Sequence, residues 1–336
     1  MRVTGIATTL LLAAGISAPA FADDACPPLT ILTSVDMTIG NSGRVFVPAQ
    51  IDGTPQNMLV DTGAFFSLLT ENAVDALHLT RHSSKLLLVN VAGKNTRTSV
   101  TASFALGNLR ADSVDFAVAF DGLNFDRDLA GSGGVLGGNM LTDYDLDFDF
   151  ANKKLNLISR KHCEGKVVYW PAGTVAVVPI KVTDEFHIQV PVQLDGHDYT
   201  ALLDTGAAYT ILDLHDATRD FSLKPGDADT PAHGHLGPGD ENPTYVHRFK
   251  SLSLKGMAIS NPVVALLPDL MGSKLAHPVD TVANRLRDPG AETAPRDMIL
   301  GMDILRRLHL YIAYTEKKLY ITPAAPPAAP APAAGR

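Results

Sequence analysis

One stretch of this chain occurs twice, and the repetition limits the possible folds more than any other feature. Leu59–Ala64 reads LVDTGA, and Leu202–Ala207, which lies 143 residues later, reads LLDTGA. At the same offset and without a gap, Val47–Gly53 (VPAQIDG) falls on Val190–Gly196 (VPVQLDG). A repeat as long as a domain indicates two lobes built on one plan, because solenoid repeats are much shorter.

A second pair of matching blocks closes each half of the chain. Val135–Gly137 (VLG) matches Ile299–Gly301 (ILG), and Asn152–Leu157 (NKKLNL) matches Glu316–Ile321 (EKKLYI). These blocks are 164 residues apart, so the second half carries 21 additional residues between its first and last blocks. We interpret the chain as a tandem duplication of one domain-sized unit.

The apolar segments of each half are short and often alternate with polar residues, which is the pattern of half-buried strands. Turn signals such as Asp52-Gly53 and Asp121-Gly122 separate them. Short helices are predicted over Glu71–Leu79 and Leu214–Ala217, with Thr70 and Asp213 as suitable N-caps, and after each closing glycine. The predicted fold class is all-β, with two homologous β-barrel lobes and a few short helices.

The two ends of the chain differ in composition from the lobes. The N-terminus has one Arg, an apolar run and an A-x-A site, which is typical of a secretory signal peptide; an uncleaved membrane anchor is the alternative. The tail is almost entirely Pro and Ala, which cannot build a core. The predicted division is 1–22 signal peptide, 23–160 N-terminal lobe, 161–172 interlobe linker, 173–322 C-terminal lobe and 323–336 disordered tail. We expect an exported protein, periplasmic or secreted, with no membrane insertion after signal cleavage.

The two cysteines and the net charge bear on the compartment and the partners of the protein. Cys26 and Cys163 are expected to form one disulfide in an oxidising compartment, the alternative being two buried free thiols. The formal net charge of −8, without basic clusters, argues against nucleic acid as a partner.

Asp61 and Asp204 are the candidate catalytic residues. A pair of carboxyls can activate water when one is ionised and accepts a proton while the other is protonated and donates one. A single DTG is weak evidence, since the triplet is also an ordinary turn sequence and its aspartate can simply cap the turn. The second copy, at the end of the same apolar run and followed again by Ala, favours the catalytic interpretation.

On these motifs the chain resembles aspartic proteases of the retropepsin/pepsin class, and most closely the bacterial exported retropepsin-like proteins with tandem domains. The resemblance runs from about Ile31 to Ile321. It implies that two DTG loops meet at a pseudo-twofold axis and that both aspartates share one water. Thr62 and Thr205 would then bond across the axis, Gly63 and Gly206 would support the site, and the two closing blocks would pass behind the loops.

The resemblance also sets expectations about cofactors and assembly. No metal and no cofactor is expected, the substrate is a peptide or protein, and the chain is expected to be a monomer with pseudo-dimeric lobes. Ala64 and Ala207 follow the triplets, as in retropepsins, where pepsin-like enzymes usually have a hydroxyl that lowers the pKa of the aspartate. We therefore predict activity at mildly acidic to near-neutral pH.

Two further segments, one in each half, occupy the place of a flap. Leu86 to Phe104, with Ala92-Gly93-Lys94 at its tip, is predicted to be a hairpin that closes over substrate. The corresponding region of the second half, roughly Pro225 to Phe249, is either a second flap of different shape or a loose loop. Its histidines, His233, His235 and His247, are more typical of a solvated loop than of a zinc site, because no fourth ligand stands at a fixed spacing.

The sequence thus predicts an aspartic endopeptidase with one active site between two lobes. Two alternatives stay open. The chain is a non-catalytic peptide-binding protein that keeps the fold, or each lobe pairs with its counterpart in another molecule.

Overall fold

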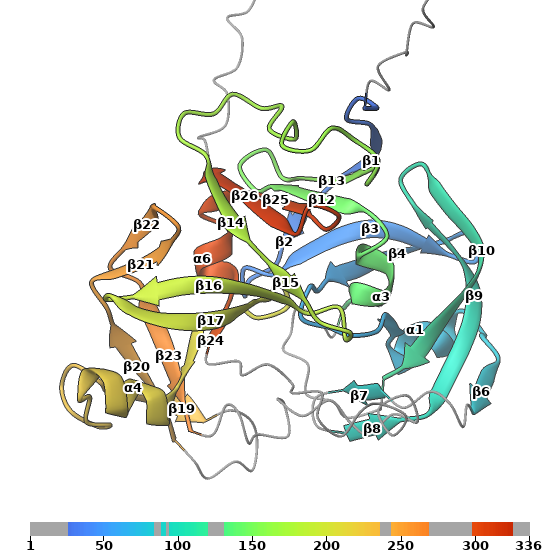
Figure 1. Cartoon of the computed structure of the whole chain (residues 1–336). Helices are drawn as coiled ribbons and strands as arrows, with labels where there is room; N and C mark the ends of the chain where they lie inside the picture. Colours follow the sequence, from blue (N-terminus) through green and yellow to red (C-terminus); the bar gives the residue numbers. More distant parts are fainter. Residues whose placement is uncertain are drawn as a thin grey trace, which may run out of the picture.

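A computed structural model describes residues 26–83, 89–91, 94–119, 131–235, 243–268 and 298–324 (Figure 1). The predicted signal peptide and the tail beyond residue 324 lie outside the described residues. Among the residues that are described, no helix has the length and apolar character needed to cross a membrane.

The first lobe is an eight-stranded sheet in the order β2-β3-β4-β11-β5-β10-β9-β6, with β3 also pairing with β9. That extra pairing folds the sheet back on itself. Its elements are β2 (Thr38–Ile39), β3 (Val45–Ile51), β4 (Thr54–Val60), β5 (Leu68–Leu69), α1 (Glu71–Ala76), β6 (Arg81–Ser83), β9 (Thr98–Leu106), β10 (Leu109–Val118), β11 (Gly134–Leu136) and α3 (Gly138–Leu141). A separate hairpin is formed by β7 (Val89–Val91) and β8 (Lys94–Thr96).

The second lobe repeats this plan in a larger sheet, in the order β19-β20-β23-β18-β24-β17-β16-β21-β22, with β15 paired to β16. Its elements are β15 (Lys181–Val182), β16 (Ile188–Leu194), β17 (His197–Leu203), β18 (Ile211–Asp213), α4 (Leu214–Phe221), β19 (Ala232–His235), β20 (Pro243–Arg248), β21 (Ser251–Leu254), β22 (Met257–Ser260), β23 (Val263–Leu267), β24 (Met298–Leu300) and α6 (Met302–Leu305). The all-β class with two related lobes is therefore confirmed.

A six-stranded sheet lies above both lobes in Figure 1 and joins them. Its order is β1-β13-β12-β25-β26-β14, so strands of the first half pair directly with strands of the second. Its members are β1 (Ile31–Asp36), β12 (Asp145–Asp149), β13 (Lys154–Ile158), β14 (Ala176–Pro179), β25 (Leu308–Ala313) and β26 (Lys318–Pro323). The central contact is β12 with β25, which pairs Phe148 with Leu310. The last strands of the two halves, β13 and β26, therefore lie in one sheet.

Equivalent residues of the two halves adopt the same local structure. β3 and β16 show the same alternation of buried and exposed positions, as half-buried strands require. Each is followed by an Asp-Gly turn in which both residues have positive φ, 46° and 74° at Asp52-Gly53 and 44° and 87° at Asp195-Gly196. Positive φ at both central positions is the type I′ geometry of two-residue hairpins. The repeated DG signal thus sets the register of both hairpins.

The short helices begin where the sequence predicts. The Thr70 side chain accepts a hydrogen bond from the Ala73 N–H at the start of α1, and Asp213 accepts from His215 at the start of α4. α1 ends earlier than the predicted Leu79, and α4 runs longer than predicted, to Phe221. The helices after the closing glycines, α3 and α6, are single turns.

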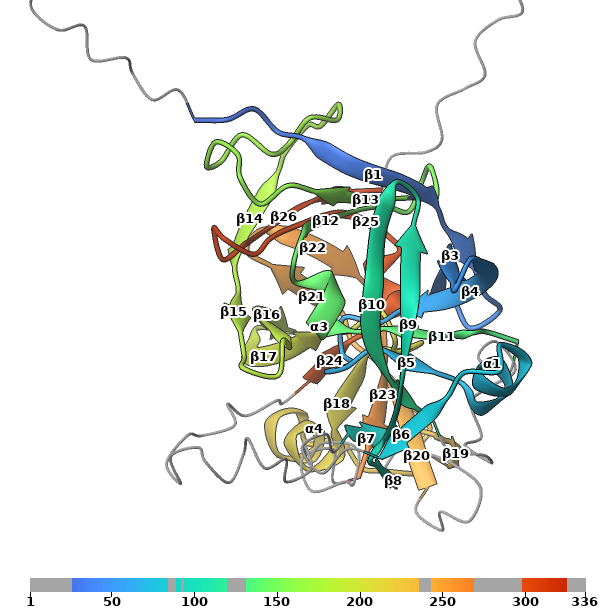
Figure 2. The same ribbon diagram turned by 90° about the vertical axis from the view of Figure 1, so that its right-hand side faces the viewer.

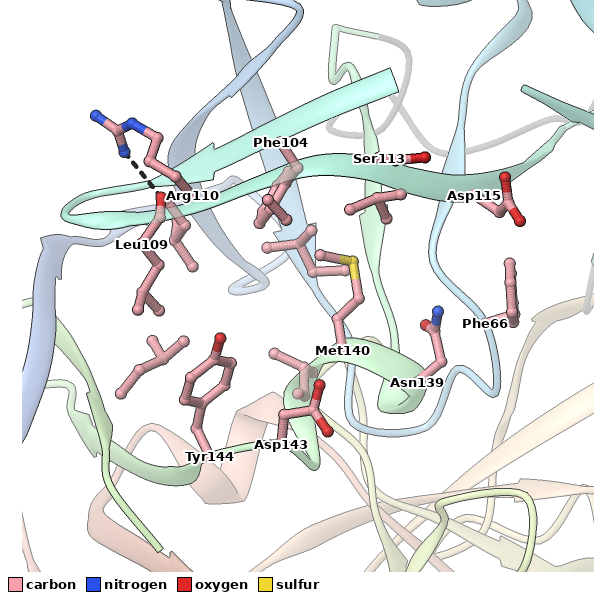
Figure 3. Close-up of a pocket in the computed structure, with 16 residues that line it drawn as sticks. Phe66, Phe104, Leu109, Arg110, Ser113, Asp115, Asn139, Met140, Asp143 and Tyr144 are labelled. Carbon is pink, nitrogen blue, oxygen red and sulfur yellow. Dashed lines mark hydrogen bonds between the residues drawn. The ribbon is translucent and has the colours of Figure 1, made fainter. Parts of the chain in front are cut away.

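A cavity of about 330 Å³ lies inside the first lobe, between β10 and α3 (Figure 3). Its walls are mostly apolar and include Phe104, Met140 and Leu157, and Figure 3 shows Met140 and Tyr144 extending toward β10. Its lining includes Phe66 of the loop after the first DTG, but no residue of either triplet.

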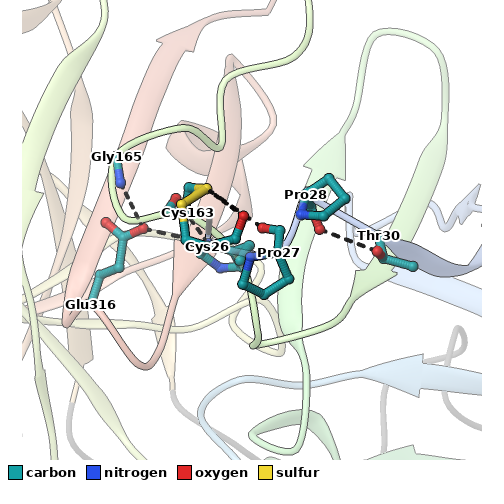
Figure 4. The surroundings of a disulfide bond; sticks show 8 residues. Cys26, Pro27, Pro28, Thr30, Cys163, Gly165 and Glu316 are labelled. Carbon is teal, nitrogen blue, oxygen red and sulfur yellow. Dashed lines mark hydrogen bonds and ion pairs between the residues drawn. A yellow bond between two sulfur atoms is a disulfide. The ribbon is translucent and has the colours of Figure 1, made fainter. Parts of the chain in front are cut away.

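Cys26 and Cys163 are joined in a disulfide, as predicted, with their Cα atoms 5.1 Å apart (Figure 4). The bond ties the start of the described chain to the linker between the lobes. Because the loop closed by the bond spans 137 residues, the bond restricts the unfolded chain strongly.

The linker between the lobes packs against the outer face of the six-stranded sheet. His162 Nε2 lies 2.6 Å from Asp145 Oδ2, and both side chains are almost fully buried. The Trp170 ring stacks on His309 with a centroid distance of 4.0 Å, and His309 in turn bonds Asp147. The linker is thus part of the structure that holds the lobes together (Figure 2).

Candidate active site

The two DTG loops follow equivalent strands and are held by equivalent closing blocks. β4 leads to Asp61 and pairs in parallel with β11, while β17 leads to Asp204 and pairs in parallel with β24. The Asp61 N–H donates to Leu136 O at 3.0 Å, and the Asp204 N–H donates to Leu300 O at 3.1 Å. The closing blocks therefore hold the backbone of each aspartate, as the resemblance implied.

Thr62 and Thr205 bond each other's loops. The Thr62 N–H donates to Thr205 Oγ1 at 3.1 Å, and the Thr205 N–H donates to Thr62 Oγ1 at 3.0 Å. Each hydroxyl then donates to the opposite strand, Thr62 to Leu203 O and Thr205 to Val60 O, both at 2.7 Å. All four bonds join the halves of one chain, so the two loops pair within the molecule.

The aspartate carboxyl groups meet over the glycines. Asp61 Oδ1 accepts the N–H groups of Gly63 and Ala64, both at 2.9 Å, and Asp204 Oδ1 accepts those of its own loop at 2.8 and 3.1 Å. A Cβ placed on Gly63 would overlap the Asp204 carboxyl, and one on Gly206 would overlap that of Asp61. Only glycine leaves room for each carboxyl to cross onto the opposite loop.

The close approach changes the ionisation of both groups. Burial raises the pKa of Asp61 well above its ordinary value, and the charge of Asp204 raises it further. Burial also raises the pKa of Asp204, but N–H bonds from Gly206 and Ala207, the bond with Asp61 and the Arg44 guanidinium oppose that rise. Two carboxyls this close retain one proton between them and titrate as a pair.

Two further side-chain clusters, which were not predicted from the sequence, support the loops. In the first lobe Asn139 Oδ1 accepts from the Ser67 N–H and hydroxyl at 2.7 and 2.8 Å, and Ser67 Oγ accepts from the Gly137 N–H. In the second lobe Thr210 and Asp303 make the equivalent bonds at 2.8 and 2.7 Å. The sequence contains two signals for these clusters. A hydroxyl residue stands six positions after each aspartate, and an amide or carboxyl residue stands two positions after each closing glycine.

The structure gives both halves a hairpin at the expected place. In the first half β7 pairs with β8, while β9 belongs to the main sheet, so the hairpin is shorter than the predicted Leu86 to Phe104. Val89 of β7 packs in a cluster with Leu68 and Phe66, beside the first loop. In the second half β19 pairs with β20, which favours a second hairpin over a loose loop. The predicted tip residues Ala92 and Gly93, and residues 236–242, lie outside the described residues.

His233 and His247 of the second hairpin have different surroundings. The His247 ring bonds the Thr230 hydroxyl and Asp229 O, and His233 lies exposed on β19. Among the described residues, no three His, Cys, Asp or Glu side chains converge as a metal-ligand set.

Aromatic residues surround the first loop. Phe65 stacks on Phe186 of the second lobe, with ring centroids 5.7 Å apart and an interplanar angle of 11°. In the second loop the equivalent of Phe66 is Tyr209, whose side chain is 62% exposed. Both loops therefore carry an aromatic ring five residues after the aspartate.

A family model described as aspartyl protease matches the chain twice, over residues 47–140 and 190–304, which together exceed half of its length. The chain belongs to the aspartyl protease family. Each matched region contains one DTG triplet and one closing block, so the family pattern is present in both lobes. No curated protein matches the chain.

A solved structure of an aspartic proteinase is similar to most of the chain. It is the aspartic proteinase from Irpex lacteus, with a TM-score of 0.50 and 15% sequence identity. The match covers 88% of this chain and 98% of that chain. At this identity the likeness concerns the fold alone.

Proposed function

We propose that the protein is an aspartic endopeptidase in which Asp61 and Asp204 act as one catalytic dyad. The observation that carries the proposal is the crossing of the two carboxyls over each other's glycines, within one chain. The family and the hydrogen bonds between the loops support it.

The dyad would act through a water molecule held between the carboxyls. The ionised aspartate accepts a proton from that water, and the oxygen then attacks the peptide carbonyl. The protonated aspartate donates a hydrogen bond to the carbonyl oxygen and stabilises the tetrahedral intermediate. Protonation of the leaving nitrogen completes the cleavage and returns the pair to its singly protonated state.

The pH dependence follows from that single shared proton. Activity falls at low pH as the ionised carboxyl gains a proton, and at high pH as the pair loses the proton it retains. Because burial raises the pKa of both groups, we propose a maximum at mildly acidic to near-neutral pH. A maximum at about pH 2–3, the strongly acidic range of pepsin-like dyads, would contradict this.

The substitutions Asp61→Asn and Asp204→Asn test the shared site with nearly unchanged shape. Each alone is expected to lower cleavage of a peptide library by about a thousandfold, the scale of lost acid–base catalysis. Asp112→Asn, at an exposed position of β10, is the matched control and should retain activity. Substantial activity left in either single variant would refute one shared dyad.

Export in the mature form is part of the proposal and has a separate test. Mass spectrometry of the protein recovered outside the cytoplasm should show an N-terminus at Asp23. A folded wild-type protein that binds peptides but never cleaves them would instead support a peptide-binding function.

A further inference from the structure

Arg44 crosses from the first lobe to the catalytic loop of the second. It stands in the turn between β2 and β3, which is closed by the bond from the Gly40 N–H to Arg44 O at 2.9 Å. Its Nε donates to Gly206 O at 2.6 Å, and the side chain is partly buried. A guanidinium stays charged across the ordinary pH range, so the Gly206 carbonyl lies against a fixed cation.

The Gly206 carbonyl is one end of a peptide unit that also bonds the dyad. The N–H of the same peptide belongs to Ala207 and donates to Asp204 Oδ1 at 3.1 Å. A cation on the carbonyl oxygen polarises the peptide and makes its N–H a stronger donor, because bonds in a chain reinforce one another at low dielectric. Arg44 therefore acts on Asp204 both through space and through this peptide.

The second lobe carries a different residue at the position equivalent to Arg44. The repeat offset places His187 of the second lobe where Arg44 stands in the first. His187 Nδ1 lies 3.9 Å from Glu185 Oε2, so any positive charge on its ring has a buried carboxylate beside it. Equivalent positions of the two lobes thus carry different groups. Arg44 is a permanent cation, whereas His187 has an acidic side chain beside it.

Two charged groups have the largest effect on the pKa of Asp204. They are Asp61, from the loop after β4, and Arg44, from the turn between β2 and β3; its own loop contributes backbone N–H donors. For Asp61 the charged neighbour is Asp204. The dyad is therefore electrically unequal, and the negative charge is more stable on Asp204.

We propose that Arg44 is a positioning residue that keeps Asp204 as the carboxylate and leaves the shared proton on Asp61. This inference rests on the proposed function and assigns roles within it. Asp204 accepts the proton of the water, and Asp61 donates a hydrogen bond to the peptide carbonyl. The charge at Arg44 and its bond to Gly206 O are the cause of the asymmetry.

The first test is the pH profile of kcat/KM for Arg44→Gln and Arg44→Lys. Arg44→Gln is expected to move the acidic limb of the profile to higher pH by about one unit. At pH values below the limb, kcat/KM would then be roughly tenfold lower, while it would change little at the optimum. Arg44→Lys keeps the charge and should shift the limb less. The matched control is Arg219→Gln, at an exposed arginine of α4 that pairs with Asp216 and Asp220. It should leave the limb unchanged.

A merely structural role for Arg44 predicts a different result. The rate would fall by the same factor at every pH, and the limb would stay in place; this outcome overturns the inference. An unmoved limb in an otherwise active Arg44→Gln protein overturns it as well, while the proposed endopeptidase function stands.

A second measurement does not depend on catalysis. Carboxyl groups labelled with ¹³C at aspartate are titrated by NMR, and the two dyad signals are assigned by their loss in Asp61→Asn and Asp204→Asn. Asp204 is expected to ionise first, and Arg44→Gln is expected to raise its titration midpoint. Ionisation of Asp61 first in the wild type would overturn the inference, even in a protein that cleaves nothing.

Discussion

Replacing Thr205 by Val tests whether the bonds between the two loops stabilise the whole molecule. Valine has nearly the shape of threonine, so the change removes one hydroxyl and leaves packing almost unaltered. That hydroxyl is fully buried and accepts from the Thr62 N–H at 3.1 Å while donating to Val60 O at 2.7 Å. Both of its partners belong to the other lobe.

The expected cost follows from these two bonds. A neutral hydrogen bond contributes about 0.5–1.5 kcal/mol, and a buried group that loses its partner costs about 1–3 kcal/mol more than one that keeps it. The Thr62 N–H and Val60 C=O both lose this partner, so we expect Thr205→Val to lower the free energy of unfolding by about 2–4 kcal/mol. That is a large share of the roughly 5–15 kcal/mol of a typical protein.

The assay is urea unfolding followed by fluorescence and circular dichroism, with Thr205→Ser as the control. Serine keeps the hydroxyl and loses one methyl, worth about 0.8 kcal/mol. Thr62→Val should behave like Thr205→Val, because its hydroxyl makes the equivalent two bonds. A valine variant within about 0.5 kcal/mol of the serine variant would refute the argument that these bonds hold the lobes.

Three further results are expected. Gly206→Ala should lower peptide cleavage at least a hundredfold, because the added Cβ would overlap the Asp61 carboxyl. Gly173→Ala, with open space around it, is the control and should be neutral. Peptide-cleavage rates measure the effect, and circular dichroism checks that both variants fold. Asp61→Asn should raise the melting temperature at neutral pH but less at pH 4. Burial raises the pKa of Asp61, so this carboxyl binds its proton more tightly in the folded state. Its contribution to stability therefore falls as the pH rises from the unfolded-state pKa to the folded-state pKa. Equal increases in melting temperature at both pH values would contradict this reasoning. Double replacement of Cys26 and Cys163 by serine should cost about 2–4 kcal/mol in urea unfolding, and a loss below 1 kcal/mol would show that the bridge contributes little.

Much of the fold could be predicted because the same local signals occur twice. The Asp-Gly turns, the N-caps Thr70 and Asp213 and the strand alternation are all short-range features, and each acts through its immediate neighbours. The pairing of Cys26 with Cys163 could be predicted because only two cysteines were present. These features fixed the class, the number of lobes and the place of the candidate site.

The contacts between the lobes could not be predicted in the same way. The bond from Arg44 to Gly206 O and the stacking of Phe186 on Phe65 join residues more than a hundred positions apart. No spacing in the sequence indicates them, because they depend on how the two barrels meet. The buried pair of His162 and Asp145 is similar: it arises only because the linker folds back onto the six-stranded sheet.

A single chain with two unequal lobes can do what two identical subunits cannot. In a symmetric pair, any residue that acts on one aspartate acts on the other, and the shared proton has no preferred position. Here the turns before the two DTG strands differ, with Gly43 and Arg44 in one lobe and Phe186 and His187 in the other. One turn brings a cation to the opposite loop, and the other brings an aromatic ring that stacks on Phe65. In the mechanism proposed above, this difference between the two turns separates the acid from the base without altering either triplet.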